Sequence, residues 1–335
     1  MSLPRGNCRF SLAVAFTLAI FLTASLAQDI TLHGGTTVVL VPTLVTNIAG
    51  EPVFGLSAAN FSVYDNGVEQ KVHLDEDAPA AQTSVVIAVE KGHSADGTLD
   101  KVRRLGSLLY PIVGEGRGEV AVVAFDDKPE VKLDFTANLD QATKALTQIA
   151  PGSYGSAVLD AIAYSTQMLD SRPPTSRKVL FLVSGPNDDN SKASIPEVMR
   201  QIERSNVLIY SATYSQTASS KIGETIADPA QHPVNLLGAF SSLLKSAKEN
   251  VPKTVAEMSG GEYLPFHDEK VLEQELAGVN NHFFNQYLLS FTPKKLALGQ
   301  HSLRVVIVDR SDLVVTARTG YWVGEALPKD AAEGK

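Results

Sequence analysis

A short polar loop that follows an apolar, strand-like run holds the residue types that could do chemistry. It reads Glu90-Lys91-Gly92-His93-Ser94, so a carboxylate, an ammonium, an imidazole and a hydroxyl lie close together in sequence. Such a loop could present the serine as a nucleophile on a sharp strand-to-helix turn. It could also be one corner of a site for a hard cation, either intact or lost. The elements around the loop decide how each interpretation stands.

The nucleophile interpretation rests on partial motifs. Gly92-His93-Ser94 resembles the start of a Gly-x-Ser-x-Gly elbow, and His-Gly-Gly at 33–35 resembles an oxyanion motif. The elbow needs a small residue two positions after the serine, and this chain has Asp96 there. Triad histidines could come from His232, His267, His282 and His301. We expect most histidines to lie at the surface or in caps, and we expect no catalytic residue.

The first 27 residues are typical of a secretory signal. Arg5 and Arg9 precede an apolar stretch, and the small-x-small sequence at 25–27 fits cleavage before Gln28. The stretch is near the lower length limit for a membrane span, so a retained anchor is the alternative. We expect cleavage, and hence a secreted or periplasmic protein with no stable membrane insertion afterwards.

Charge and cysteine content exclude several classes of protein. The formal net charge is −8, and it falls by two, to −10, when the two arginines of the signal are removed. No long basic run is present, so we expect no nucleic-acid partner. The single cysteine, Cys8, lies in the signal, and the mature chain therefore has neither disulfides nor thiolate metal ligands.

Strand patterns at the two ends of the chain enclose an α/β pattern. Residues 36–75 alternate as an antiparallel set does, with a hairpin turn at Asp65-Asn66-Gly67. From residue 83, short apolar runs alternate with helical spacing, which indicates a parallel sheet with right-handed crossovers. Strand patterns return near residue 285. Each β segment has too few strands to be stable alone, so we predict one β-sandwich built from both, with the α/β domain inserted.

This organisation predicts five segments with the following bounds. They are a signal peptide at 1–27, an N-terminal β segment at 28–80, an α/β domain at 83–282, a C-terminal β segment at 283–324 and a disordered tail at 325–335. The tail is assigned as disordered because it lacks residues that could join a core.

Several stretches resemble a known family. They are VFGLSAANFSVYDNGVEQ before the α/β domain, VAVVAFDD and LDFTANLDQATKAL within it, and MSGGEYLPF, NQYLLSFTP and ARTGYWV further along. Together they resemble secreted bacterial proteins of acidobacterial type that carry a von Willebrand factor type A domain, over most of residues 36–323. The resemblance implies a doubly wound, mostly parallel, Rossmann-like sheet. It also implies contact with a protein or a matrix, and not catalysis.

In this family three loops at the carboxyl ends of the sheet often hold a divalent ion, where open parallel sheets generally bind ligands. The family's first loop is Asp-x-Ser-x-Ser. Here Glu90, Gly92 and Ser94 stand at those three positions, so the acid is longer, the middle hydroxyl is missing and only the last serine matches. Lys91 adds a positive charge beside the expected site.

The second and third loops also depart from the pattern that the resemblance implies. Ser156 stands where a threonine is expected, and Gly185 where an aspartate is expected, with Asp188 and Asp189 further on as possible substitutes. Because Mg²⁺ demands near-octahedral oxygen ligands, we expect a degenerate site with no cofactor, Mg²⁺ being the only ion to consider. Three changes, Glu90→Asp, Gly92→Ser and Gly185→Asp, should raise metal affinity if the loop geometry is intact.

The sequence therefore predicts an exported, non-enzymatic binding, adhesion or envelope scaffold protein with an unidentified protein partner. We expect the binding surface in the loops around Lys91, His93, Asp126 and Asn187. Two alternatives remain, a conventional Mg²⁺-dependent adhesion domain and a serine hydrolase that uses Ser94.

Overall fold

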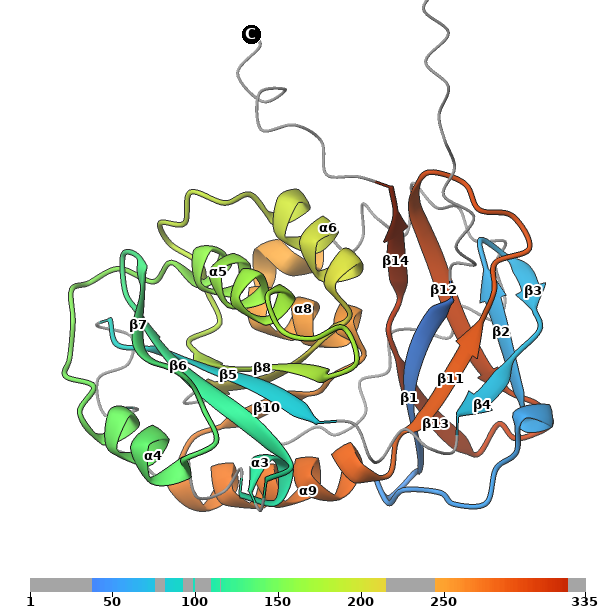
Figure 1. Ribbon diagram of the computed structural model, residues 1–335, viewed down its shortest axis with the longest axis horizontal. Helices are drawn as coiled ribbons and strands as arrows, with labels where there is room; N and C mark the ends of the chain where they lie inside the picture. Colours follow the sequence, from blue (N-terminus) through green and yellow to red (C-terminus); the bar gives the residue numbers. More distant parts are fainter. Residues whose placement is uncertain are drawn as a thin grey trace, which may run out of the picture. The chain divides into compact units, whose positions relative to one another are not determined.

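The computed structural model describes residues 38–75, 82–92, 99, 110–114, 116–214 and 245–324 (Figure 1). The predicted signal peptide and the tail after Gly324 lie outside the described residues, as do His93 and Ser94. Within the described ranges, no helix has both the length and the apolar character needed to cross a membrane.

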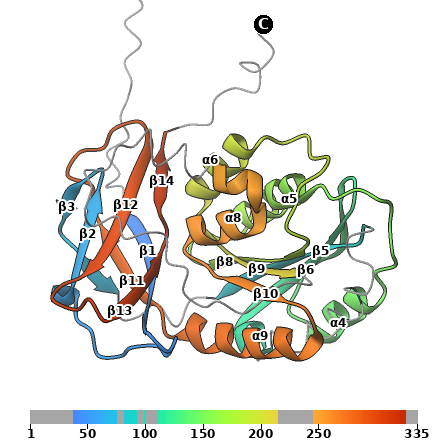
Figure 2. The same ribbon diagram turned by 180° about the vertical axis from the view of Figure 1, so that it is seen from behind.

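A six-stranded sheet forms the centre of the α/β domain (Figures 1 and 2). Its strands are β5 (Thr83–Glu90), β6 (Gly118–Phe125), β7 (Pro129–Thr136), β8 (Arg177–Ser184), β9 (Val207–Tyr214) and β10 (Tyr263–Phe266). The order is β10-β9-β8-β5-β6-β7, and neighbours pair in parallel except β7, which runs antiparallel to β6. Strand β5 is buried along its whole length, as its continuous apolar run predicts.

Helices cover both faces of this sheet (Figure 1). One face carries α5 (Val158–Asp170), α6 (Ile195–Ser205) and α8 (Val251–Ser259), and the other carries α3 (Tyr110–Val113), α4 (Leu139–Thr147) and α9 (Glu269–Phe284). Successive side chains of a strand point to opposite faces, so Val86 packs with the first set of helices and Ile87 with the second. The fold is the doubly wound, mostly parallel α/β class that the sequence predicts. Helix α9 extends two residues past the expected boundary at 282.

The two ends of the chain build one β-sandwich. Its strands are β1 (Val39–Asn47), β2 (Phe61–Asp65), β3 (Val68–Gln70), β4 (His73–Asp75), β11 (Tyr287–Phe291), β12 (Gly299–Ile307), β13 (Leu313–Ala317) and β14 (Gly320–Val323), with a short 3-10 helix η1 (Ala58–Asn60) before β2. The antiparallel sheets have the orders β13-β1-β11-β4 and β14-β12-β2-β3. Early and late strands alternate in the first sheet, and in the second the late pair β14-β12 joins the early pair β2-β3. Val41 and Val63 share a core with Leu289 and Phe291. The predicted shared sandwich with an inserted α/β domain is confirmed.

His301 is an exception to the expectation that most histidines lie at the surface or in caps. The residue is 1% exposed inside the sandwich. Its Nδ1 lies 2.8 Å from Asp65 Oδ1, its Nε2 lies 2.8 Å from the Ala297 carbonyl, and Tyr321 donates to the other Asp65 oxygen at 2.9 Å. Burial first, and then this hydrogen bond, raises the pKa of Tyr321. The ring therefore joins β12 to β2 and β14 across one sheet.

Arg318 connects the sandwich to the α/β domain. Its side chain is 5% exposed and donates to the carbonyls of Gly320 at 2.8 Å and Glu203 at 2.6 Å, and to the Asn206 side chain. Glu203 and Asn206 belong to the carboxyl end of α6, where a helix offers unpaired carbonyls and partial negative charge. Burial lowers the pKa of Arg318 to about 10, so the guanidinium stays charged at neutral pH.

Arg318→Gln should lower the free energy of unfolding by about 2–4 kcal/mol, because it leaves buried acceptors without a charged donor. Chemical denaturation of the purified chain measures the change. Arg310→Gln is the matched control, since Arg310 pairs with Asp312 on the surface and both side chains are about half exposed. Equal stability of the two variants would show that Arg318 is not the main connection.

Candidate functional site

Several loops meet at the carboxyl ends of β5, β6 and β8, which is the edge where an open parallel sheet presents ligand-binding groups. Glu90 ends β5 and Lys91 follows it, while Asp126 follows β6. Residues 152–156 lead into α5, and residues 185–190 follow β8. We call this set the loop face.

Lys91 and Asp126 form an ion pair at the centre of the loop face. Lys91 Nζ lies 2.6 Å from Asp126 Oδ2, and the two side chains are 15% and 13% exposed. The same carboxylate oxygen accepts a hydrogen bond from the Ser153 amide at 3.1 Å. Burial alone would raise the pKa of Asp126, but the hydrogen bonds and charge of Lys91 and the Ser153 amide outweigh it and hold that pKa well below its usual range. The ammonium therefore compensates this carboxylate from within the chain.

Glu90 points into the sheet edge and is 2% exposed. Its Oε2 accepts a hydrogen bond from the Gly185 amide at 2.6 Å, while Oε1 has no hydrogen-bond partner among the described residues. Burial raises the pKa of Glu90, although the hydrogen bond from the Gly185 amide opposes the shift. The first acid of the predicted site thus holds the β8 loop through its backbone amide.

A second set of hydrogen bonds joins the remaining loops. Asp127 accepts from Ser153 Oγ and from Asn190 Nδ2, both at 2.5 Å. Asn190 Oδ1 in turn accepts from the Ser156 amide at 3.0 Å, and Ser156 Oγ donates to the Asn187 carbonyl at 3.2 Å. The Ser156 hydroxyl is therefore engaged with the β8 loop, and the loops around β6, α5 and β8 are tied to one another.

Neither proposed substitute for the missing third-loop acid takes its place. Asp188 Oδ1 accepts from the Leu159 amide at 2.9 Å and from Ser191 Oγ at 2.5 Å, so this carboxylate caps the start of α5. Asp189 is exposed, and its charge contributes to the raised pKa of Glu90. Within the described ranges, no three His, Cys, Asp or Glu side chains are grouped so that they could hold a metal ion. The described residues of the loop face thus do not supply the ligand set of a divalent ion, and Ser94 lies outside the described residues.

Two glycines of the loop face lie close to other groups, Gly92 against backbone and Gly152 against side chains. A Cβ at Gly92 would lie 2.1 Å from the Gly155 carbonyl oxygen. A Cβ at Gly152 would lie 2.3 Å from Asp126 Oδ2 and 2.8 Å from Lys91 Nζ. The expectation that Gly92→Ser would help to restore metal binding fails on this geometry, because the loops must separate before a serine fits.

Comparison with known proteins agrees with this architecture. Residues 86–187 match the family model described as von Willebrand factor type A domain. The chain contains a von Willebrand factor type A domain. No curated protein matches the chain.

Solved structures similar to this chain include other proteins with this type of domain. The conserved hypothetical protein BatB from Bacteroides thetaiotaomicron is 14% identical with a TM-score of 0.39, covering 59% of this chain and 98% of that chain. Proximal thread matrix protein 1 of the mussel byssus, with a zinc-occupied MIDAS motif, is 13% identical with a TM-score of 0.45, covering 65% of this chain and 49% of that chain. The tip protein Mfa5 of Porphyromonas gingivalis type V pili is 16% identical with a TM-score of 0.30, covering 32% and 39%.

The sequence singled out Lys91 and Asp126 separately and missed their ion pair. A signal for it exists, because each residue directly follows one of two neighbouring parallel strands. Glu90 lies opposite Phe125 in the β5–β6 register, which places Lys91 beside Asp126 in the type A domain. Asn190, which bonds two loops, was not singled out, and nothing in the run at 187–190 distinguishes it from a solvated polar loop.

Glu90→Gln should stabilise the type A domain at high pH by about 1 kcal/mol, because it keeps the acceptor for Gly185 and removes a buried charge. The raised pKa means that the stability of the native chain falls as the pH rises through that pKa. In denaturation experiments, the advantage of the variant should therefore shrink as the pH is lowered toward 4.5, the ordinary pKa of this carboxyl group. Glu130→Gln, on the exposed part of β7, should show no such gain. A constant difference across this pH range would contradict the argument.

Proposed function

We propose that the protein is an exported, non-enzymatic binding or scaffold protein of the cell envelope. Its type A domain contacts a protein partner through the loop face without a bound metal ion. Support for export comes from the first 27 residues, which carry the pattern of a cleaved signal. Support for metal independence comes from the internal network of the loop face.

The ion pair between Lys91 and Asp126 carries this proposal. A divalent ion near Asp126 would be repelled by the ammonium 2.6 Å away from that carboxylate. Gly185 supplies an amide to Glu90 at the third-loop position, where a carboxylate would be needed as a ligand. In this reading the chain's own cation holds the loops together, and partner recognition depends on the shape and side chains of the loop face.

Tyr154 is the most exposed aromatic residue of the loop face. It is 82% exposed and lies in the segment 152–156, whose backbone is held by Asp126 and Asn190. Exposed tyrosines on a rigid frame contribute strongly to protein interfaces, since they offer a large contact area at low cost in conformational entropy. We infer that Tyr154 is a central contact for the partner.

A pull-down from envelope extract, with the chain lacking residues 1–27 as bait, tests this role. Tyr154→Ala should weaken capture of a saturable partner by at least about tenfold, while EDTA should leave capture unchanged. Tyr164→Ala, which removes a 37% exposed tyrosine on α5 of the same domain, is the control and should have no effect. Loss of capture in EDTA would contradict metal independence, and unchanged capture by Tyr154→Ala would contradict the role of the loop face.

One observation favours the alternative of a Mg²⁺-dependent adhesion domain. Glu90 Oε1 is a buried carboxylate oxygen without a partner among the described residues, and such an atom would suit an ion or its bound water. Calorimetry with Mg²⁺ and with Mn²⁺ separates the two possibilities. We expect no saturation below about 1 mM, because most of the other ligands are replaced or engaged. Saturation in the micromolar range would support the alternative.

The serine hydrolase alternative uses Ser94, which lies outside the described residues. The described candidate histidines are engaged elsewhere. His282 lies 2.7 Å from Glu262 and 3.0 Å from the Gly50 carbonyl, and His301 is inside the sandwich. A serine needs an oriented histidine within hydrogen-bond reach to become a nucleophile.

We therefore expect a fluorophosphonate probe to leave the purified protein unlabelled. Heat-denatured protein gives the background for this measurement. Labelling of the native chain that is lost in Ser94→Ala would establish the hydrolase and overturn the non-enzymatic part of the proposal.

A further inference from the structure

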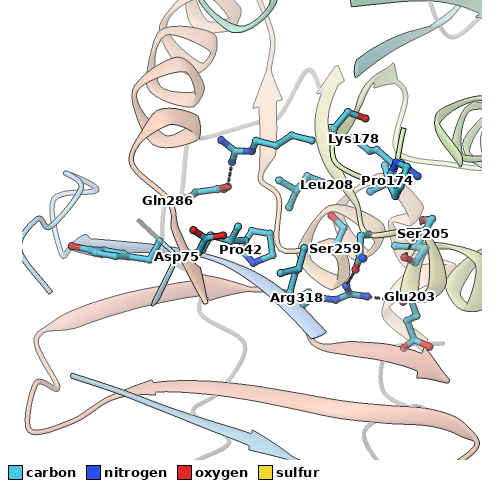
Figure 3. Close-up of a pocket in the computed structure, with 18 of the residues that line it drawn as sticks. Pro42, Asp75, Pro174, Lys178, Glu203, Ser205, Leu208, Ser259, Gln286 and Arg318 are labelled. Carbon is cyan, nitrogen blue, oxygen red and sulfur yellow. Dashed lines mark hydrogen bonds between the residues drawn. The ribbon is translucent and has the colours of Figure 1, made fainter. Parts of the chain in front are cut away.

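A cavity of about 860 Å³ lies between the type A domain and the sandwich (Figure 3). It is bounded by the amino ends of β8 and β9, the carboxyl ends of α6 and α8, and the outer face of the sheet that contains β1, β11 and β4. The loop face is at the opposite ends of the parallel strands. A cavity of this size is within the range that proteins use for small-molecule ligands.

The sandwich side of the cavity is apolar because of the strand period. Val39 and Val41 of β1 point into the sandwich core, so Leu40 and Pro42 point to the other face and line the cavity. Leu288 lies opposite Pro42 in the β1–β11 register and lines it too. These side chains form a floor on which an apolar ligand body could pack.

The type A domain adds further apolar atoms and the wall that carries charge. Ile202, Val207, Leu208 and Met258 line the cavity from this side. Lys178 also lines it, but its ammonium is 3.5 Å from Asp170. Figure 3 shows Leu208 and Lys178 on the wall that faces Pro42.

Among the described residues, Arg177 is a charged group of the lining with no carboxylate bonded to it. It donates to Gln286 Oε1 at 2.9 Å and to the Phe283 carbonyl at 3.3 Å, and its guanidinium carbon lies 4.0 Å from the centre of the Phe283 ring. Burial lowers its pKa. Neither of these acceptors is a carboxylate, and a guanidinium has five N–H donors, so donors remain for an anion. Arg177 is partly buried, and a carboxylate is the usual partner of a guanidinium.

We propose that this cavity binds a small monocarboxylate with an apolar body, whose carboxylate contacts Arg177 and whose body packs on Leu40, Pro42 and Leu288. A single negative charge fits because Arg318, the buried arginine of the lining, already donates to three oxygens of the chain. Asp75 and Asp170 in the lining disfavour a dianion such as a phosphate monoester. The site is separate from the loop face and does not depend on the function proposed for it.

Decanoate is a suitable probe for calorimetry and thermal denaturation of the chain lacking residues 1–27. Decanol has a hydrocarbon chain of the same length without the charge, and butyrate has the carboxylate with a short hydrocarbon chain. We expect decanoate to saturate one site and to raise the melting temperature, with decanol and butyrate at least about tenfold weaker. Decanol binding as tightly as decanoate would overturn the assignment of the anion, and so would the absence of saturation by decanoate.

Two variants locate the site. Arg177→Gln should weaken decanoate at least about tenfold while leaving decanol unchanged. Leu40→Trp fills the floor of the cavity from the outer face of β1 and should abolish binding of both, which keeps the proposal testable if Arg177→Gln does not fold. Arg310→Gln, far from the lining on an exposed turn, should bind as the native chain does. Unchanged decanoate binding by either cavity variant would contradict the proposal.

Discussion

The hydrogen bonds from the Arg318 guanidinium to the carboxyl end of α6 fix the position of the inserted type A domain relative to the sandwich. The chain leaves the sandwich after β4 and returns at β11, so only short connections join the two parts covalently. Without a polar lock, such a pair of connections would allow hinge motion. Arg318 restricts that motion because two oxygens of the type A domain, the Glu203 carbonyl and the Asn206 side-chain oxygen, would lose a buried donor if the parts separated.

Two weaker contacts act beside it. His282 of α9 reaches the Gly50 carbonyl in the loop after β1, and its hydrogen bond to Glu262 raises its pKa. The Thr319 amide donates to the carbonyl of Met258 at the end of α8, where Gly260 allows the β13–β14 corner to approach, since a Cβ there would lie 2.6 Å from the Arg318 amide. The parts therefore touch at their margins, and the cavity lies between these contacts.

Charged side chains at the two ends of the parallel sheet differ in whether an opposite charge is bonded to them. At the carboxyl ends, Lys91 and Asp126 compensate each other, and the loop carboxylates accept amide or hydroxyl donors, apart from one Glu90 oxygen. At the amino ends, Arg177 is surrounded by a ring, an amide and a carbonyl, with no carboxylate bonded to it among the described residues. In the first arrangement, the Lys91 and Asp126 charges are paired within the chain. The second leaves a place for an anion where this class of fold does not usually bind ligands.

The sequence predicts the layers of this protein better than its polar contacts, for a physical reason. Strand β5 is buried on both faces, and this requires a continuous run of apolar residues. The hairpin turn has positive φ angles at residues 66 and 67, and this favours Asn and Gly there. Both features can therefore be recognised from a short stretch of sequence. Asp188 caps α5 only because the first turn of that helix lies beside it, and Arg318 binds the carbonyl of Glu203 only because α6 ends beside the sandwich. In the sequence, Arg318 is a single charged residue between Ala317 and Thr319, in a run that has the pattern of a strand. Contacts between distant elements have no local pattern, and these are the contacts that decide the chemistry of both ends of the sheet.

The glycines of the loop face explain why its departure from the metal-binding pattern is hard to reverse. Gly92 packs on the Gly155 carbonyl, so a Cβ at position 92 requires the backbone of the two loops to separate, whereas a Cβ at position 152 would meet only atoms of the Asp126 and Lys91 side chains. A serine at position 92 would therefore have to open the loops before it could offer its hydroxyl to an ion, and opening would separate Asp126 from Ser153 and Lys91. Each ligand restored alone costs stability and gains no ion, because the cation becomes favourable only when most ligands are present together. The ion pair and the missing ligands thus maintain each other, and the loop face is a stable arrangement in its own right.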